Sequence, residues 1–295
     1  MKNKMENLNS ISKTWRKIRD DFTKANIDNA SLDARLLAEH AFKLNSLELA
    51  TNENQQVTEQ QLMRLEELAK RRLNGEPVAR ILGKKEFYGL EFKLNKKTLV
   101  PRPESELLVD ICLEQIGENQ NLKLLELGVG SGCIIISILA NNDNLVGLGT
   151  DISQEALEIA KSNARFHNVL ERIRFLRGNW FERLNTNKKF DVIISNPPYI
   201  ETKEIATLAK EVKDFDPVLA LDGGEDGLEP YRIIARNAKN YLNDNGFVIV
   251  EFGIGQEGEI IEMFLGEGFT LFEQKLDLSG IARALVFQNL KHFAD

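Results

Sequence analysis

The chain has 295 residues, of which 42% are hydrophobic and 28% charged, which is enough to bury a sizeable core and to form two domains. Its net charge of −7 argues against a protein that holds long nucleic-acid duplexes, because such binding depends on clustered Lys and Arg. No apolar run approaches the roughly 20 residues of a membrane span and the N-terminus lacks the apolar stretch of a secretory signal, so we expect a cytoplasmic protein without membrane association.

Apolar residues recur at helical spacing from residue 12 to about residue 83, which predicts a small helical bundle. Thr58 with Gln61 three residues later fits a capping box at one helix start, and Ser31 fits an N-cap at another. Residues 1–83 are therefore expected to form an N-terminal helical domain that docks the substrate.

Residues 85–94 alternate apolar and polar side chains around Gly89, as a β-hairpin does. In the segment 99–106, two prolines favour an extended backbone. We expect residues 84–110 to form a hairpin and Pro-rich linker, a hinge before a domain of residues 111–295.

From residue 122 onward, short apolar runs alternate with helical stretches, which indicates a doubly wound parallel sheet because parallel neighbours require crossover helices. Strands are expected at 123–127, 145–150, 173–176, 192–195 and 247–252. Two more runs, 270–276 and 284–287, predict a terminal hairpin with one strand antiparallel to the rest. The predicted fold class is α/β, with the helical bundle and the hairpin attached to a Rossmann-like sheet.

A glycine-rich loop from Glu126 to Gly132 follows the first of these strands and opens a helix. Glycines let the backbone approach a ligand closely, and Asp151, which ends the second strand, can accept hydrogen bonds from both hydroxyls of a ribose. The Gly-x-Gly-x-Gly spacing differs from that of dinucleotide binders, which favours a ligand with a ribose but no pyrophosphate. After the third strand, Asn179 is expected to bind an adenine edge and Trp180 to stack on the ring; a core Trp beside a loop Asn is the alternative.

The most specific motif is Asn196-Pro197-Pro198-Tyr199, which follows a buried strand. Because consecutive prolines supply no N–H, the carbonyls of Asn196 and Pro197 are expected to be free as acceptors. Two acceptors suit the two hydrogens of an NH₂ group on a flat conjugated system, and Tyr199 would stack on its plane. Asn196, Pro197 and Tyr199 are the expected catalytic residues, and all four are expected to bind the substrate. The alternative is a tight Pro-Pro loop with a surface tyrosine.

Methyltransferases that act on adenine N6, on guanine N2 of ribosomal RNA and on protein glutamine share this tetrapeptide after the fourth strand. The chain further resembles the release-factor glutamine N5-methyltransferases, the HemK/PrmC family of class I enzymes, over nearly its whole length. The resemblance rests on Phe87-Tyr88-Gly89, the hairpin and residues 33–37, 101–106 and 277–283. Arg102 and Glu104, in the segment 101–106, are expected near the active site, although a structural Arg–Glu pair is the alternative.

This resemblance implies S-adenosylmethionine as cofactor, with S-adenosylhomocysteine as product. The expected cofactor-binding residues are Glu126, Gly128, Val129, Gly130, Ser131, Gly132, Asp151, Asn179, Trp180 and Asn196. In the family the position of Asn179 more often carries Asp, which weakens the expected adenine contact. The implied partners are peptide-chain release factors, methylated on the glutamine of their Gly-Gly-Gln loop, with no stable nucleic acid, and the enzyme is expected to be a monomer.

Three alternatives remain open. A ribosomal-protein glutamine methyltransferase would share the site and differ in its docking surface. The net charge disfavours nucleic-acid N-methylation, and the intact glycine-rich loop, Asp151 and the tetrapeptide disfavour a non-catalytic adaptor.

Cysteines and histidines add no further chemistry. Cys112 and Cys133 lie in apolar periodic segments, so we expect buried thiols in a reducing compartment. His40, His167 and His292 have no ligand spacing around them, and no metal site is expected.

Overall fold

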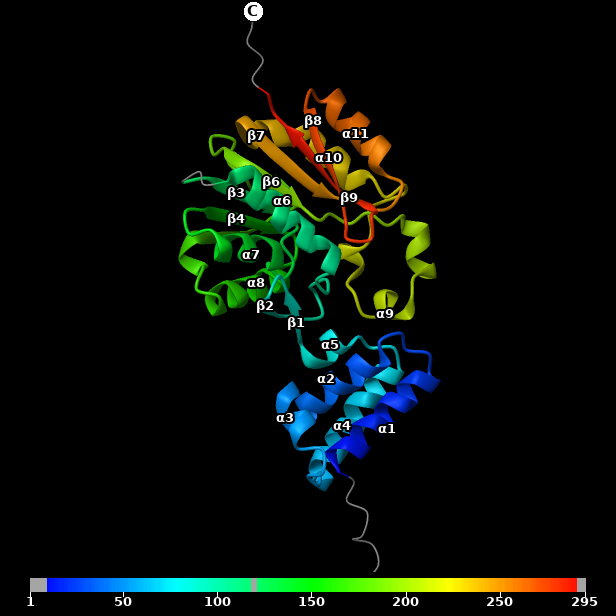
Figure 1. Cartoon of the computed structure of the whole chain (residues 1–295). Coiled ribbons are helices and arrows are strands. Elements are labelled where there is room, and N and C mark those ends of the chain that lie inside the picture. Colours follow the sequence, from blue (N-terminus) through cyan, green and yellow to red (C-terminus); the bar gives the residue numbers. More distant parts are fainter. Residues whose placement is uncertain (1–9, 118–120, 291–295) are drawn as a thin grey trace, which may run out of the picture. The chain divides into compact units, whose positions relative to one another are not determined.

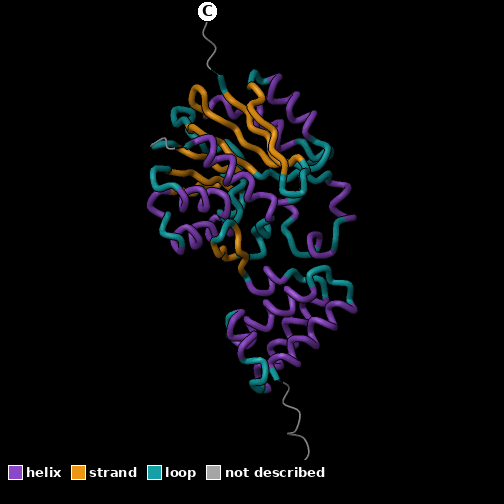
Figure 2. The backbone as a smooth tube through the Cα atoms, viewed as in Figure 1, coloured by secondary structure: helices purple, strands orange, loops and turns teal. Residues whose placement is uncertain are grey.

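The computed structural model describes residues 10–117 and 121–290, and the chain divides into two compact units, residues 1–83 and 84–295. Figure 2 shows helices alone in the first unit and a helix-flanked sheet in the second. His292 and the first nine residues of the N-terminus lie outside the described residues. Across the described ranges, no helix is long and apolar enough to cross a membrane.

The first unit is helical, as its periodicity predicts. Its helices are α1 (Ile11–Lys24), α2 (Ala30–Phe42), α3 (Ser46–Thr51), α4 (Glu59–Leu73) and α5 (Val78–Leu82). The capping box of Thr58 and Gln61 is confirmed at the start of α4. The expected N-cap at Ser31 is wrong, because α2 already begins at Ala30, after Asn29. Phe22, Leu37 and Leu65 are fully buried in this unit.

The second unit contains the predicted sheet, and every expected strand is present. The strands are β3 (Lys123–Leu127), β4 (Val146–Asp151), β5 (Ile173–Arg177), β6 (Phe190–Ser195), β7 (Leu242–Glu251), β8 (Thr270–Leu276) and β9 (Ala282–Gln288). They lie in the order β5-β4-β3-β6-β7-β9-β8. β9 alone of these runs antiparallel to the β3–β7 group, which confirms the terminal hairpin.

Helices cover both faces of this sheet (Figure 1). α6 (Glu106–Ile116), α7 (Cys133–Asn141) and α8 (Gln154–Phe166) pack on one face, where Ile135 is fully buried. α10 (Glu229–Ala238) and α11 (Glu257–Gly266) pack on the other, where Tyr231 and Phe264 are fully buried. Between β6 and α10 the chain forms only short turns, η3 (Thr202–Thr207), α9 (Lys210–Lys213) and η4 (Val218–Ala220).

The predicted hairpin consists of β1 (Lys84–Phe87) and β2 (Leu90–Lys93). Its two turn residues, Tyr88 and Gly89, both have positive φ, which matches the right-handed twist of a hairpin. Phe87 and Phe92 are buried in the same core cluster as α6 to α8. The hydroxyl of Tyr88 donates to Asp110 on α6 at 2.7 Å, so the hairpin is fastened to the sheet-containing unit.

The Pro-rich segment after the hairpin departs from the extended backbone expected over residues 99–106. Pro103–Ser105 form a 3₁₀ turn, η1, that leads directly into α6. Proline suits the first position of a helical turn, because its fixed φ is helical and its missing N–H would have no partner there.

Candidate active site

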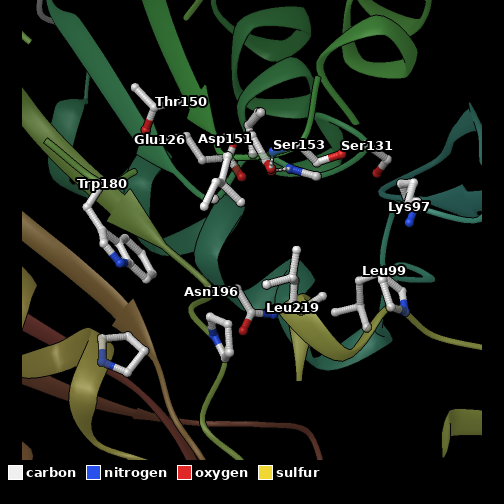
Figure 3. Close-up of a pocket in the computed structure, with 18 of the residues that line it drawn as sticks. Lys97, Leu99, Glu126, Ser131, Thr150, Asp151, Ser153, Trp180, Asn196 and Leu219 are labelled. Carbon is white, nitrogen blue, oxygen red and sulfur yellow. Dashed lines mark hydrogen bonds between the residues drawn. The ribbon is translucent and has the colours of Figure 1, made fainter. Parts of the chain in front are cut away.

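A cavity of about 920 Å³ opens at the carboxyl ends of β3, β4 and β6. In the strand order β5-β4-β3-β6-β7, the chain extends the sheet outward in one direction from β3 to β5 and then in the other direction from β6. Ligands of doubly wound folds bind at this position. The residues singled out from the sequence that line it are Glu126, Gly128, Val129, Gly130, Ser131, Asp151, Asn179, Trp180, Asn196 and Pro198. Gly132, Pro197 and Tyr199 are not in its wall. Figure 3 shows Asp151, Trp180 and Asn196 around this one space.

Backbone hydrogen bonds tie the glycine-rich loop to the end of β4. Gly128 N and Val129 N both donate to Thr150 O at 2.9 Å, and Gly130 N donates to Asp151 Oδ2 at 2.9 Å. A Cβ added at Gly128 or Gly130 would meet no protein atom within 4 Å, so this backbone faces open space.

Gly132 has a packing role at the end of the loop. Its φ is +82°, and an added Cβ would lie 2.6 Å from Ile136 Cδ1 and 3.3 Å from Ala160 Cβ. A side chain here would crowd Ile136 of α7 and Ala160 of α8, and the positive φ would strain it.

Asp151 is held with its carboxylate at the cavity. Besides the bond from Gly130, its Oδ1 accepts from Ser153 N at 2.8 Å. Burial raises the pKa of Asp151, although the hydrogen bonds from Ser153, Gly130 and Ile152 oppose the shift. An ionised carboxylate has about four lone-pair sites, so capacity remains for a ligand's hydroxyl groups.

Glu126 is a second carboxyl group in the wall, and it is buried. Its Oε2 accepts from Ile135 N at 3.1 Å in the first turn of α7. Burial raises the pKa of Glu126 well above its ordinary value, and the nearby Asp151 raises it further. Glu126 thus supplies one of the bonds that orient the start of α7.

Asn179 and Trp180 line the cavity beyond β5. Trp180 is half-buried and has a φ of +51°, a strained backbone for a bulky residue. Asn179 is exposed and donates only a long 3.4 Å hydrogen bond to Glu182. Both side chains can therefore reach a ligand.

The tetrapeptide begins directly after β6. Asn196 Nδ2 donates to Ser105 Oγ at 2.8 Å, and among the described residues none donates to the main-chain carbonyl of Asn196 or Pro197. Tyr199 is half-buried and packs on the core beneath α10 and α11. Its carbonyl accepts from Gln256 Nε2 at 3.0 Å, which fixes the end of the loop.

Several wall residues were not predicted from the sequence to lie in the site. They include Lys97, Leu99, Ser105, Ile152, Val218 and Leu219. Arg102 lines the cavity as expected, whereas Glu104 is not in its wall. Arg102 pairs with Asp216 at 2.7 Å, so the alternative of a structural pair between Arg102 and Glu104 is wrong. Asp216 lies more than a hundred residues away in an irregular segment that has no periodicity to reveal it.

The two cysteines differ in their surroundings. Cys112 is buried as expected, whereas Cys133 is half-buried and lines the cavity at the start of α7. Burial raises the pKa of both thiols to about 12, so neither is a thiolate near neutral pH. In residues 10–117 and 121–290, His, Cys, Asp and Glu form no group of three that could hold a metal ion.

Comparison with known proteins assigns the chain to a family. The family model described as PrmC N-terminal domain matches residues 13–83, and the model described as Methyltransferase small domain matches residues 104–220. Release factor glutamine methyltransferase of Agrobacterium fabrum is 40% identical over 268 residues, which cover 90% of this chain and 92% of that protein. The chain belongs to the release factor glutamine methyltransferase family.

Other matches differ in length or similarity. A bifunctional methyltransferase of Rickettsia felis is 38% identical over 94% of this chain, which spans only 58% of that longer protein. A crystal structure of a methyltransferase from Pyrococcus furiosus superposes with a TM-score of 0.53 at 21% identity, covering 75% of this chain and 98% of that one. This last likeness confirms the class I methyltransferase fold.

S-adenosylmethionine is the cofactor of this methyltransferase family, and the cavity has the donors and space that it needs. Backbone at Gly128 and Gly130 borders open space, the Asp151 carboxylate suits ribose hydroxyls, and Trp180 offers an aromatic face. We propose these as the residues that would hold the cofactor.

Asn163 of α8 connects this cofactor loop to the hairpin. It is fully buried, its Oδ1 accepts from Lys93 N at 2.9 Å, and its Nδ2 donates to Lys93 O at 3.1 Å and Ser131 O at 2.9 Å.

Asn163→Leu should lower the free energy of unfolding by about 2–4 kcal/mol, because buried groups lose their partners. It should also weaken cofactor binding through Ser131. Urea unfolding and calorimetry test both effects, with exposed Asn187→Leu expected to stay within about 0.5 kcal/mol; equal stability of the two variants would contradict the prediction.

Proposed function

We propose that this protein transfers a methyl group from S-adenosylmethionine to the side-chain amide nitrogen, N5, of the glutamine in the Gly-Gly-Gln motif of peptide-chain release factors. The observation that carries the proposal is the position of Asn196, at the end of β6 and in the wall of the cavity that Asp151 also lines. The names of the relatives supply the substrate, and the acceptors of the loop suit a flat amide.

When bound, S-adenosylmethionine supplies a methyl group on a positively charged sulfur. The protein's part is to hold and orient the amide, whose nitrogen is a poor nucleophile because its lone pair is delocalised. Asn196 Oδ1 and the carbonyls of Asn196 and Pro197 are the acceptors available for its two N–H groups. Drawing both hydrogens toward acceptors favours a pyramidal nitrogen, and fixed orientation can lower the barrier by at most about 7–11 kcal/mol.

The remaining roles follow from the substrate. A lone glutamine is a small target, so residues 1–83 are proposed to supply docking area, of which a standard interface needs about 800 Å² per partner. Catalytic roles for Asn196, Pro197 and Tyr199, action as a monomer and a cytoplasmic location are part of the same proposal.

Incubating the chain with release factor and isotope-labelled S-adenosylmethionine should add one methyl group, located by tandem mass spectrometry on the glutamine of the Gly-Gly-Gln loop. A release factor with that glutamine replaced by alanine should remain unlabelled, while one with a distant surface glutamine replaced should be labelled normally. Label that persists in the first variant would reject this substrate. Label on a ribosomal protein alone would favour the other class of glutamine methyltransferase.

A further inference from the structure

Glu251, the last residue of β7, is a buried carboxyl group beside the substrate loop that the proposed reaction does not yet use. The register of β6 and β7 pairs Ser195 with Val250, so the next residues, Asn196 and Glu251, are neighbours at the same end of the sheet. Glu251 is 3% exposed. Its Oε2 is buried without a hydrogen-bond partner among the described residues, a costly arrangement that calls for a function.

The surroundings of Glu251 act on its charge in opposite directions. Burial raises its pKa to about 7, and Glu104 adds to the rise, whereas hydrogen bonds from Ser105 and Asn196 and the charge of Arg283 lower it. The titratable and charged groups that face it are Glu104 of η1, Cys133 of α7, Tyr199 after β6, Tyr231 of α10 and Arg283 of β9. Both the ionised and the protonated carboxyl group are therefore accessible near neutral pH.

Ser105 links this carboxyl group to Asn196. Its hydroxyl accepts from Asn196 Nδ2 at 2.8 Å, and its own proton is then available for an acceptor. An ionised Glu251 is such an acceptor, because a carboxylate without a proton can only accept. The resulting chain runs from Asn196 through Ser105 to Glu251, and Asn196 also donates to Glu251 directly. Both contacts commit the carboxamide nitrogen of Asn196 to this side.

The other end of the carboxamide is then fixed. Among the described residues none donates to Asn196 Oδ1, so this oxygen is available to accept an N–H of the substrate. A protonated Glu251 can donate instead, which would let Ser105 donate to the Asn196 oxygen and turn the NH₂ group toward the substrate. Two NH₂ groups cannot hydrogen-bond each other through their N–H groups, so the reversed carboxamide cannot hold the amide.

We infer that Glu251 is a positioning residue which, directly and through Ser105, sets the carboxamide of Asn196 with its oxygen toward the substrate amide. The inference rests on the proposed function in assigning that amide to a glutamine. The charge of the carboxyl group sets the direction of the pH dependence. The productive orientation of Asn196 is present when Glu251 is ionised and is lost as the pH falls through about 7. Its kinetic signature is a change in kcat with little change in cofactor affinity.

The first test needs no protein substrate. In ¹⁵N-labelled protein with cofactor bound, the side-chain NH₂ resonances of Asn196, assigned by their loss in Asn196→Asp, should shift with pH around a midpoint near 7. Glu251→Gln should abolish this shift because glutamine does not titrate, and Glu273→Gln, on the edge strand β8, should retain it. The same midpoint in Glu251→Gln, or no shift in the unmodified protein, would overturn the inference.

The second test measures turnover. Between pH 6 and 8, kcat should rise about tenfold in the unmodified protein, as expected for one group titrating near pH 7, and it should be nearly flat in Glu251→Gln. If Glu251→Gln does not fold, Ser105→Ala breaks the link through the hydroxyl group and should reduce the size of the Asn196 shift, because only the direct contact with Glu251 remains; an undiminished shift would exclude the part assigned to Ser105. A resonance shift without methylation of release factor would reject the substrate and retain the inference, whereas methylation without the shift would do the reverse.

Discussion

Asn196→Ala is expected to lower kcat for release-factor methylation by about 10²–10³-fold, the usual loss when one preorganised hydrogen-bonding group at a reacting centre is removed. The variant loses the carboxamide oxygen that would accept an N–H of the substrate amide and the bond to Ser105. Affinity for S-adenosylmethionine should change far less, because Asp151 and the glycine-rich loop remain intact. Single-turnover kinetics with saturating cofactor, together with calorimetry, separate the two effects.

Two further substitutions test whether the loss of turnover is specific to the carboxamide of Asn196. Asn187→Ala, in an exposed loop, should leave kcat unchanged. Asn196→Asp keeps acceptor oxygens but loses the Nδ2 donor and places a second carboxyl group beside Glu251, so turnover should still fall, most strongly at high pH. Unchanged turnover in Asn196→Ala would remove the basis for assigning the chemistry to this loop.

The spacing of apolar residues along the chain was sufficient to predict the fold, because the burial of one face of each element produces that spacing. The strands of the sheet are buried between two helical layers, so their sequences are short apolar runs that are easy to recognise. The glycine-rich loop follows β3 directly, and Asp151 ends β4. These features needed only local sequence, as did the capping box at Thr58.

The parts that escaped prediction depend on contacts between distant segments. Glu251 ends an apolar strand as an ordinary polar residue, and its position beside Asn196 follows from the sheet order rather than from any motif. Arg102 forms an ion pair with Asp216, which lies in an irregular segment, rather than with the nearby Glu104. Helix starts are similarly ambiguous where no side chain caps them, as at Asn29.

Asp151→Ala is expected to weaken S-adenosylmethionine binding by about 100-fold. A hydrogen bond to a charged group contributes about 1.5–3 kcal/mol, and the loss of about 3 kcal/mol corresponds to two orders of magnitude in Kd. The same change leaves Gly130 N and Ser153 N without their acceptor, so the loop that borders the cofactor would also loosen. Isothermal titration calorimetry with S-adenosylhomocysteine, which is stable in solution, measures the loss.

The matched control is Asp143→Ala, whose side chain is 95% exposed and whose removal should leave Kd within a factor of about two. Asp151→Asn keeps one acceptor oxygen and should lose about tenfold in cofactor affinity, half of the free-energy effect.

Because burial raises the pKa of Asp151 above the ordinary value, the ionised form that best accepts hydroxyl groups is lost at a higher pH than for an exposed aspartate. Cofactor affinity should therefore decline on acidification in the unmodified protein and much less in Asp151→Asn; the same acid decline in both would place the responsible group elsewhere, with Glu126 the next carboxyl group in the wall.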